Sequence, residues 1–435
     1  MLTEWLYWLQ SIPRAELLQV LIVLILVDAP RYALCCTSIV LFDLVRDVAR
    51  ALVPSWRKKP VWDPHTPSVC VLIAGHNEAS TIESTVGSLW GTYPRMEVIV
   101  IDDGSTDGMA EAAQRFAHTH EGVRVLSRNE RGGKSSALNW GLSYTKAEIV
   151  VSVDADSHLM PNAIWEIVQP FVDPDVGAVS ATLRAWNPFA NLATWMQAYE
   201  YRQSIFLGRM IEARLNVLAI VSGAFGAFRR DILKDQLQGW DVGPGEDGDL
   251  TLKIRKSKRR IAVAPKAVCL TNVPTKWTGL FRQRLRWDRS IITLSRKHFR
   301  MAFLTGKRVT ASDWWLLLDQ WFFNVICPYM FWAWVIQTAV SYVADPMASI
   351  NTFYLLFLLY LCQLGLEVLQ VLALFFYTKT PRQDLIICSM LPFAPLYRIF
   401  LKAATATAIT QELLFRKSYR DNFVPKRVRE ATWHW

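Results

Sequence analysis

The sequence predicts an α/β domain with a mostly parallel sheet, flanked on both sides by helices long enough to cross a membrane. From Pro67 to about Lys266, short β-branched runs alternate with helical patterns. The chain on either side is apolar in long blocks, and hydrophobic residues make up 52% of all 435 residues. The mean hydropathy of +0.16 is high for a purely soluble protein. We therefore expect part of the chain to lie in lipid.

The N-terminal region predicts a membrane anchor. The run LLQVLIVLILV, within Glu16 to Leu34, is followed by Asp28 and Pro30 and then by a second apolar patch, Ala33 to Leu44. This pattern fits one membrane segment that can kink. It has no basic n-region and no A-x-A site, so it is expected to be an uncleaved anchor and not a signal peptide.

Charge and cysteine usage indicate the compartment. Basic residues lie mainly after the anchor: only Arg14 precedes it, whereas Arg46, Arg50, Arg57, Lys58 and Lys59 follow. The positive-inside rule then places residue 60 onward in the cytoplasm. The seven cysteines form no CxxC pair, which argues against a zinc site or a disulfide framework and fits a reducing compartment.

The net charge of +10 raises the question of a nucleic-acid partner. No zinc-ligand spacing or other nucleic-acid motif accompanies the charge, so we expect none. The basic residues would instead face an anionic leaflet or an anionic substrate.

Six short runs predict the strands of the α/β domain. They are Val69–Ala74, Glu97–Ile101, Val123–Leu126, Ile149–Val153, Gly177–Ala181 and Val217–Val221. Helices are expected between them, for example Ala79–Leu89 and Lys134–Tyr144. In such sheets ligands bind beyond the carboxyl ends of the strands.

Two pairs of carboxylates follow predicted strands. VSVDADSHL places Asp154 and Asp156 at one strand end, and VIVIDDGSTD places Asp102 and Asp103 at another. Like charges at i and i+2 repel unless a cation or a polar ligand lies between them. Asp-Gly-Ser alone is ordinary turn chemistry. Four carboxylates on one sheet edge nevertheless predict Mg2+ or Mn2+ bound to a diphosphate.

Lys134, in RGGKSSALNWG, lies in a glycine-rich turn into a helix. A Walker A loop is excluded, because Arg128 stands where that motif needs a glycine. A Gly-Gly-Lys turn can still present backbone N–H groups and an ammonium to a phosphate. A solvated first-turn lysine is the open alternative.

Two further motifs carry chemistry. GPGEDGDLTLKIRK opens a helix with three acids, Glu246, Asp247 and Asp249; the helix dipole accounts for one or two of them and leaves one as a general base. QRLRW projects Gln283, Arg286 and Trp287 from one helix face. The Arg can hold an anionic leaving group and the Trp can stack on a sugar. A structural face with a buried Trp and a snorkelling Arg is the alternative.

After Thr305 three apolar blocks follow, Trp314–Val343, Thr352–Tyr377 and Leu385–Leu414, each longer than the ~20 residues needed to span a bilayer. If all three cross, the basic tail after residue 415 lies outside and breaks the positive-inside rule. Otherwise the third block, which carries Arg398 and Lys402, is interfacial. The pattern leaves both arrangements open.

The four motifs in this order, DDGS, DAD, GED and QRLRW, resemble those of the membrane-integrated processive synthases of glycosyltransferase family 2. These enzymes include cellulose, hyaluronan, chitooligosaccharide and poly-N-acetylglucosamine synthases. The resemblance covers about Pro67 to His298. VSGAFGAFRRD, Val221 to Asp231, is most similar to the poly-N-acetylglucosamine synthase branch. The resemblance implies a GT-A-like, Rossmann-like cytoplasmic domain that binds a UDP-sugar, with transmembrane helices on both sides.

The resemblance also implies a role for each motif residue. Asp102 and Asp103 would contact uridine with Lys134 near it, Asp154 would lie by the donor, and Asp156 would hold Mg2+ or Mn2+ on the diphosphate. In the GED motif, Glu246 and Asp247 would be catalytic, with Asp247 as the base. Bound diphosphate and acceptor sugar would contact Gln283, Arg286 and Trp287, and the acceptor site would be lined by Gly223, Ala224 and Phe225.

Some positions depart from the cellulose synthase pattern. Gly245 stands where those enzymes have Thr, and the loop reads SGAFG instead of their cysteine-bearing loop. The C-terminal region also lacks their cyclic-dinucleotide domain. Cellulose is therefore the less favoured product.

The function implied is a processive inverting glycosyltransferase of the plasma (bacterial inner) membrane. It would use UDP-GlcNAc, or UDP-glucose, to extend a β-linked polysaccharide and pass it through the bilayer, together with secretion or regulatory partners. Polar residues of the apolar blocks would line that path or bond helix to helix: Asp319, Asn324, Gln337, Gln363 and Glu367. The domains expected are an anchor (1–60), the transferase (61–300), membrane or interfacial helices (301–415) and a basic tail (416–435).

Two alternatives stay open. One is a non-processive transferase that loads a single sugar onto a polyprenyl phosphate, which would need neither QRLRW nor an acceptor channel. The other is a transport or scaffold protein whose α/β domain only binds nucleotide.

Overall fold

The computed structural model describes residues 14–52, 65–241, 243, 245–305, 311–344, 349–421 and 425–432. Several residues of the sequence interpretation lie outside these ranges: Arg57, Lys58, Lys59, Pro244 and most of the loop after Ala344. The chain divides into two compact units. We call Met1–Arg57 with Leu317–Ile409 the helical unit, and Lys58–Leu316 with Thr410–Trp435 the sheet unit.

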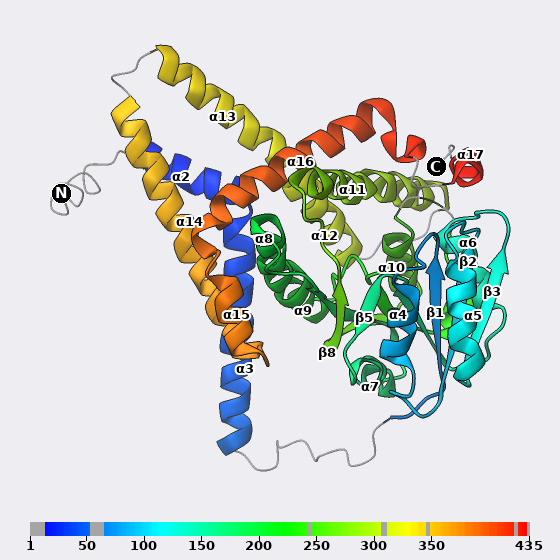
Figure 1. The fold of residues 1–435 in the computed structure, drawn as a ribbon. Coiled ribbons are helices and arrows are strands. Elements are labelled where there is room, and N and C mark those ends of the chain that lie inside the picture. Colours follow the sequence, from blue (N-terminus) through cyan, green and yellow to red (C-terminus); the bar gives the residue numbers. More distant parts are fainter. Residues whose placement is uncertain are drawn as a thin grey trace. The chain divides into compact units, whose positions relative to one another are not determined.

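The sheet unit is built on one sheet of eight strands (Figure 1). The strands are β1 (Val69–Gly75), β2 (Met96–Asp103), β3 (Val123–Arg128), β4 (Ile149–Asp154), β5 (Ser157–Leu159), β6 (Val176–Ala185), β7 (Phe225–Arg229) and β8 (Arg260–Thr271). Their order in space is β3-β2-β1-β4-β7-β6-β8-β5.

The first half of the sheet is parallel, as expected, but the second half is mixed. β1 pairs in parallel with β2 and β4, and β2 with β3. β7 runs antiparallel to both β4 and β6, and β5 runs antiparallel to β8. β6 and β8 pair in parallel. The prediction of a mostly parallel sheet therefore holds for β1 to β4 and for the β6–β8 pair, whereas β7 and β5 run antiparallel to their neighbours.

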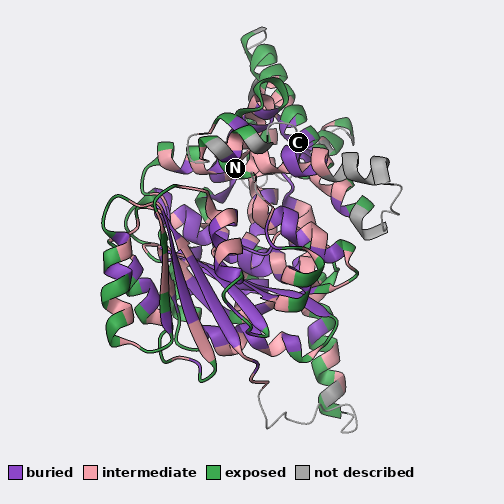
Figure 2. Cartoon of the chain, turned by 90° about the vertical axis from the view of Figure 1, so that its right-hand side faces the viewer, coloured by how far each residue is buried: buried purple, intermediate pink, exposed green. Residues whose placement is uncertain are grey.

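Helices cover both faces of this sheet, and its central strands β1 and β4 are buried almost throughout (Figure 2). The helices packed on the strands are α4 (Ile82–Leu89), α5 (Met109–Thr119), α6 (Lys134–Leu142), α7 (Ala163–Val168), α8 (Leu192–Glu200), α9 (Arg209–Arg214) and α10 (Glu246–Lys256). α11 (Trp277–Thr305) packs on α10. A continuous core joins Leu72 and Ile101 of the strands to Leu138 of α6 and Ile254 of α10. This core fixes α6 and α10, which carry two of the motifs, against the same sheet.

The predicted strand Val217–Val221 is wrong, because this segment is irregular. Its backbone donors find partners outside any sheet: Val217 N–H donates to Glu212 O at 2.7 Å and Val221 N–H to Thr251 Oγ1 at 2.8 Å. The strand of this region is β7, which begins at Phe225. Gly226 of β7 approaches Ser222 and Val221 so closely that a Cβ there would lie 2.7 Å from Val221 Cγ1.

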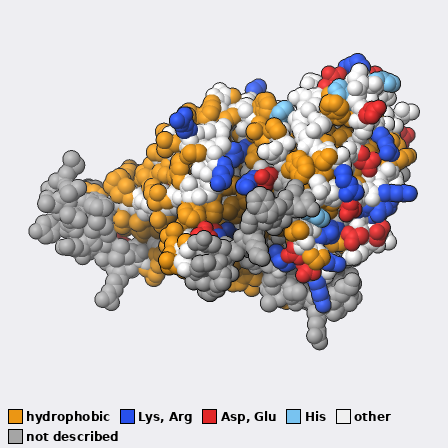
Figure 3. Space-filling view, turned by 90° about the horizontal axis from the view of Figure 1, so that it is seen from below, with side chains coloured by type: hydrophobic (Ala, Val, Ile, Leu, Met, Phe, Trp, Pro, Cys, Tyr) orange, Lys and Arg blue, Asp and Glu red, His pale blue; other side chains and the backbone are white. Residues whose placement is uncertain are grey.

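The helical unit consists of long apolar helices. They are α2 (Arg14–Leu26), α3 (Ala29–Leu52), α13 (Cys327–Ala344), α14 (Ser349–Tyr377), α15 (Pro381–Cys388) and α16 (Ala394–Phe415), with α12 (Ala311–Gln320) and the π-helical turn Trp321–Ile326 leading into α13. Two helices, Trp314–Val343 and Thr352–Tyr377, are long and apolar enough to cross a membrane. In the view of Figure 3 hydrophobic side chains gather over one part of the described surface, whereas acidic and basic side chains mix over another.

Two further spans are bent pairs. α2 and α3 meet at 80° at Asp28, which has a left-handed φ of 63°, so the expected kink in the N-terminal segment is present. α15 and α16 meet at 40°. The described part of the chain thus has two to four candidate spans, depending on whether each bent pair crosses.

Some polar side chains inside the helical unit form ion pairs. Asp319 forms an ion pair with Arg31, and the fully buried Glu367 accepts from Arg398 Nε at 2.5 Å. Gln363 is buried, whereas Gln337 is exposed. Two of the five polar residues expected to line a path are therefore held by arginines of the same unit.

Candidate active site

The ends of three parallel strands bring the carboxylate motifs together. In the register of the sheet, Gly75 at the end of β1 lies opposite Asp102 of β2, and Ala74 lies opposite Asp154 of β4. The two acidic motifs therefore flank the end of one strand, as the sheet-edge argument predicts.

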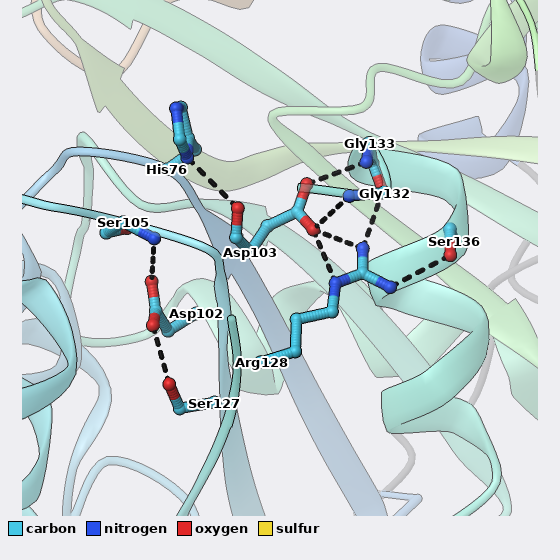
Figure 4. A network of polar contacts seen from close by, with 9 residues as sticks. All are labelled: His76, Asp102, Asp103, Ser105, Ser127, Arg128, Gly132, Gly133 and Ser136. Carbon is cyan, nitrogen blue, oxygen red and sulfur yellow. Dashed lines mark hydrogen bonds and ion pairs between the residues drawn. The ribbon is translucent and has the colours of Figure 1, made fainter. Parts of the chain in front are cut away.

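Asp102 is almost fully buried and holds a turn. Its Oδ1 accepts from Ser105 N–H at 3.0 Å, and its Oδ2 accepts from Ser127 Oγ at 2.7 Å (Figure 4). Both carboxylate oxygens thus bind residues of the same unit. The Asp102 side chain shapes the Asp-Gly-Ser turn beside β3.

Asp103 anchors the glycine loop before α6. It accepts hydrogen bonds from Gly132 N–H at 2.9 Å and Gly133 N–H at 2.7 Å, and forms an ion pair with Arg128 (Figure 4). The Arg128 guanidinium reaches on to Ser136 Oγ at 3.0 Å. A Cβ on Gly132 would lie 2.6 Å from Arg128 Nη2, so a larger residue there would displace the guanidinium.

Lys134 leaves this loop and points to the end of β4. Its Nζ forms an ion pair with Asp154 and donates to Gly223 O at 3.2 Å. Loss of water contact would lower the pKa of Lys134, but the charges of Asp154, Glu246 and Asp247 outweigh that effect and raise it. The lysine is therefore held as a cation among three acids from two segments, β4 and α10, and the solvated first-turn alternative is wrong.

Asp156 and Glu78 extend this acidic region. Desolvation, together with Asp154, raises the pKa of Asp156. Desolvation and then Asp156 raise the pKa of Glu78, which follows β1. The sequence interpretation missed Glu78, although it follows β1 much as Asp102 and Asp103 close β2.

The GED motif forms the start of α10. Gly245 precedes the helix with a left-handed φ of 77°, a conformation that favours glycine. Desolvation and the neighbouring Asp247 raise the pKa of Glu246 to about 7, from 4.5. The Asp247 carboxylate lies beside Gly223, since a Cβ there would be 3.8 Å from its Oδ2.

The SGAFG loop lies between Lys134 and Asp247. Gly223 faces both side chains, and a Cβ on it would lie 3.1 Å from Lys134 Nζ. Ala224 O accepts from Asp154 N–H at 3.3 Å, which ties the loop to the DAD motif. Phe225 begins β7, and its side chain is fully buried beneath the loop.

QRLRW lies on α11, one turn before that helix touches α10. Ser290 packs at the Gly245 cap, and Trp287 O accepts from Ser290 Oγ at 2.6 Å. Trp287 is 40% exposed, and the Arg284 guanidinium lies 4.4 Å from its ring centre. Trp287 is therefore not a buried structural tryptophan. Arg284, itself paired with Glu200 at 2.8 Å, supports its ring from one side.

The carboxylates near β4 suit a divalent cation that also binds a diphosphate. Among the described residues, no three His, Cys, Asp or Glu side chains form a complete metal site. Mg2+ and Mn2+ sites for nucleotides usually take one or two carboxylates and complete their ligand set with phosphate oxygens and water. Asp154 and Asp156 fit such a partial set, because desolvation and then the charge of Asp154 raise the pKa of Asp156.

Sequence comparison gives three informative relatives. A poly-beta-1,6-N-acetyl-D-glucosamine synthase from Staphylococcus epidermidis is 29% identical over 267 residues, 60% of this chain and 63% of the relative. A second, from S. epidermidis strain ATCC 35984, is 31% identical over 222 residues, 50% of this chain and 53% of the relative. One from S. aureus strain COL is 28% identical over 258 residues, 57% and 62% of the two chains. The chain spans less than two thirds of these relatives.

A solved structure has a similar fold. The mannosyltransferase PcManGT from Pyrobaculum calidifontis, solved with GDP-Man and Mn2+, matches with a TM-score of 0.60 and 22% identity. The match covers 89% of this chain and 99% of that chain. At this identity the likeness supports the GT-A-like fold alone.

A family model matches residues 66–290, which include all four motifs. Its description is "Glycosyltransferase like family 2". The match covers more than half of the chain and agrees with the named relatives and with the fold. The chain therefore has a GT-A-like fold and belongs to glycosyltransferase family 2.

Proposed function

We propose that this enzyme is a processive inverting glycosyltransferase that extends a β-linked polysaccharide from a UDP-sugar, with UDP-GlcNAc favoured over UDP-glucose. The observation that carries the proposal is the cluster at the end of β4. There Lys134 bridges Asp154 and Gly223, and the Asp247 side chain also lies beside Gly223. The choice of GlcNAc rests on the poly-N-acetylglucosamine synthases among the relatives.

The reaction needs a base on one side of the sugar and a stabilised leaving group on the other. Asp247 would take the proton from an acceptor hydroxyl as that oxygen bonds to the anomeric carbon. The bond from that carbon to the UDP oxygen breaks at the same time, and its electron pair leaves with UDP. Because the acceptor oxygen attacks from the face opposite UDP, the product carries a β-linkage. Arg286 and Gln283 would hold the departing diphosphate, a contribution on the order of several kcal/mol.

Binding of the donor would use residues whose positions are already fixed. Asp103 and the Gly132–Gly133 loop form one hydrogen-bonded unit from which Lys134 reaches the diphosphate region. A divalent cation, when bound by Asp156 and Asp154, would neutralise charge on the diphosphate. Ala224 and Gly223 would border the acceptor sugar, with Phe225 supporting them from below, and Trp287 would stack on it.

The membership of the C-terminal residues in the sheet unit supports one membrane orientation. Thr410–Trp435 belong to the same compact unit as the transferase residues, so both would lie on one side of the membrane. The chain between them then crosses an even number of times. Trp314–Val343 and Thr352–Tyr377 supply two crossings. The α15–α16 pair would be interfacial, and the basic tail would lie in the cytoplasm in agreement with the positive-inside rule.

The single-sugar transferase is the main competing proposal. Purified full-length protein is incubated with radiolabelled UDP-GlcNAc or UDP-glucose, and the product is sized on a gel and digested with linkage-specific hydrolases. A polymer cleaved by a β-specific enzyme supports the proposal. A one-sugar lipid product would support the alternative. No transfer and no hydrolysis from either donor, despite UDP binding, would support a nucleotide-binding scaffold.

A further inference from the structure

Four charged side chains of the sheet unit form a closed ring of ion pairs. Lys297 Nζ lies 2.7 Å from Asp241 Oδ2 and 2.9 Å from Asp249 Oδ1. Lys253 Nζ lies 2.7 Å from the same oxygen of Asp241 and 3.3 Å from Asp249 Oδ2. We call these four residues the ion ring. Its two positive and two negative charges balance, and the Asp249 side chain is only 4% exposed.

The ion ring joins two helices that carry different motifs. Asp249 and Lys253 belong to α10, three and seven positions after Glu246, while Lys297 belongs to α11. The contacts of Lys297 are therefore the ones that cross from α11 to α10. The ring also distinguishes the three acids of the motif. Asp249 forms ion pairs with two lysines, whereas Glu246 and Asp247 lie at the candidate active site.

Close packing of the two helices lies next to the ring. A Cβ on Gly248 would lie 2.5 Å from Leu294 Cδ1, and one on Gly245 would lie 3.0 Å from Ser290 Cβ. Along α11, residues at spacings of three or four share a face. This places Arg286, Ser290 and Lys297 on one stripe. The stripe runs from the QRLRW motif, past the start of α10, to the ring.

We propose that Lys297 and Asp249 are positioning residues, and that the ion ring sets the register of α10 against α11 and thereby the placement of Asp247 relative to Arg286 and Trp287. This inference rests on the proposed function. Reacting groups on separate elements need such a constraint, since a shift of about 1 Å can cost about 100-fold in rate. Buried ion pairs add little net stability, so the ring's main effect would be on geometry.

The test compares Lys297→Met with Lys297→Arg, Lys253→Met and Lys266→Met in the full-length protein. Lys266 is a matched control, because its side chain is 62% exposed and its Nζ lies as far as 3.9 Å from the Glu166 carboxylate. Three quantities are measured: kcat and KM for UDP-GlcNAc, UDP affinity, and hydrogen exchange of the amides in Glu246–Leu250 and Gln283–Trp287.

Lys297→Met is expected to lower kcat about 10- to 100-fold with UDP affinity changed less than twofold, and to speed exchange in both segments. Lys297→Arg, which keeps the charge, should recover at least a third of the activity. Lys253→Met should have the smaller effect, because Lys297 still joins the helices. Equal kcat and equal exchange in Lys297→Met and Lys266→Met would overturn the proposal, as would a loss confined to KM.

A second variant covers the case in which Lys297→Met does not fold. Asp249→Asn with Lys297→Gln removes one charge of each sign and leaves no unbalanced ion in the ring. The same loss of kcat and faster exchange support the proposal, and wild-type values contradict it. If the wild-type protein transfers no sugar, the proposed function fails, and the exchange measurement alone decides whether the ring holds the helices together.

Discussion

Arg128 and Asp103 form an ion pair across the ends of β3 and β2, and that pair fixes the loop from which Lys134 projects. The Asp103 carboxylate accepts two backbone N–H groups of the loop as well as the guanidinium. The pair is therefore part of the donor side of the site even though neither residue needs to touch the sugar.

Arg128→Met should loosen this loop and weaken UDP binding. It leaves the 5%-exposed Asp103 carboxylate without its cation, a loss on the order of 2–3 kcal/mol in stability. Thermal unfolding and UDP titration measure the two effects. Arg115→Met is the control, because Arg115 and Glu83 form an exposed pair worth about 0–1 kcal/mol. Equal melting temperatures for the two variants would contradict the prediction.

Asp247→Asn should abolish transfer without loss of the nucleotide site. Removing a general base costs about 10^2- to 10^4-fold in rate, whereas the UDP affinity should stay within about twofold. Single-turnover assays and UDP titration separate these quantities. Asp175→Asn, at a 74%-exposed carboxylate, is the control. A variant that keeps a tenth of the wild-type rate would show that another group takes the proton.

Glu246→Gln should stabilise the protein above neutral pH. The folded-state pKa of Glu246 lies near 7 instead of 4.5, so the folded protein favours the protonated form. Below pH 4.5 both states are protonated and there is no penalty; as the pH rises from about 4.5 to about 7, the wild type loses stability. The gain at pH 8 should be about 2–3 kcal/mol. Unfolding midpoints at pH 4.5 and pH 8, with Glu83→Gln as control, measure it; equal gains at both values would refute it.

Chelation of divalent cations should stop transfer. EDTA is expected to reduce the rate to background, and Mg2+ or Mn2+ in excess should restore it. Asp156→Asn should need at least about tenfold more cation for half-maximal rate, because one charged ligand is lost. Rates are measured over a cation titration, with Asp175→Asn as the reference. Full activity in EDTA would exclude a role for the metal.

An epitope tag placed after Trp435 should be reached by protease only when the membrane is opened. The C-terminal residues share a unit with the transferase, so they should be on its side of the membrane. Intact and lysed spheroplasts are digested and blotted for the tag. Digestion in intact spheroplasts would mean that α15–α16 crosses and that the two-crossing arrangement is wrong.

Local sequence was enough for the parts of the fold that depend on neighbouring residues. β1, β2 and β4 are largely apolar runs that are mostly buried, and β2 and β4 each end at a motif, so their strands and their shared edge could be predicted. Val217–Val221 has the same composition but finds its partners in Glu212 and Thr251. Composition alone could not distinguish these cases, because the difference lies in which hydrogen-bond partners the folded chain places beside each backbone segment.

Side-chain contacts between segments far apart in the chain could not be predicted from the sequence. Nothing near Asp249 indicates that Lys297 binds it, and nothing near Gly133 indicates that a Cβ there would lie 3.4 Å from Val428. The ion pair between Asp103 and Arg128 was not predicted either. In the sequence, Arg128 indicated only that the segment is not a Walker A loop. Such pairings depend on tertiary packing and not on periodicity.

Because residues 410–435 complete a unit that begins at Lys58, the order of synthesis matters. Tyr419 packs beside α11, and Arg289 of that helix forms an ion pair with Asp421 at 3.6 Å. The segment 317–409 must be made before these residues can join the rest of the sheet unit. The fold of this unit is therefore expected to be completed late in synthesis, so that a chain truncated before Thr410 would lack part of it.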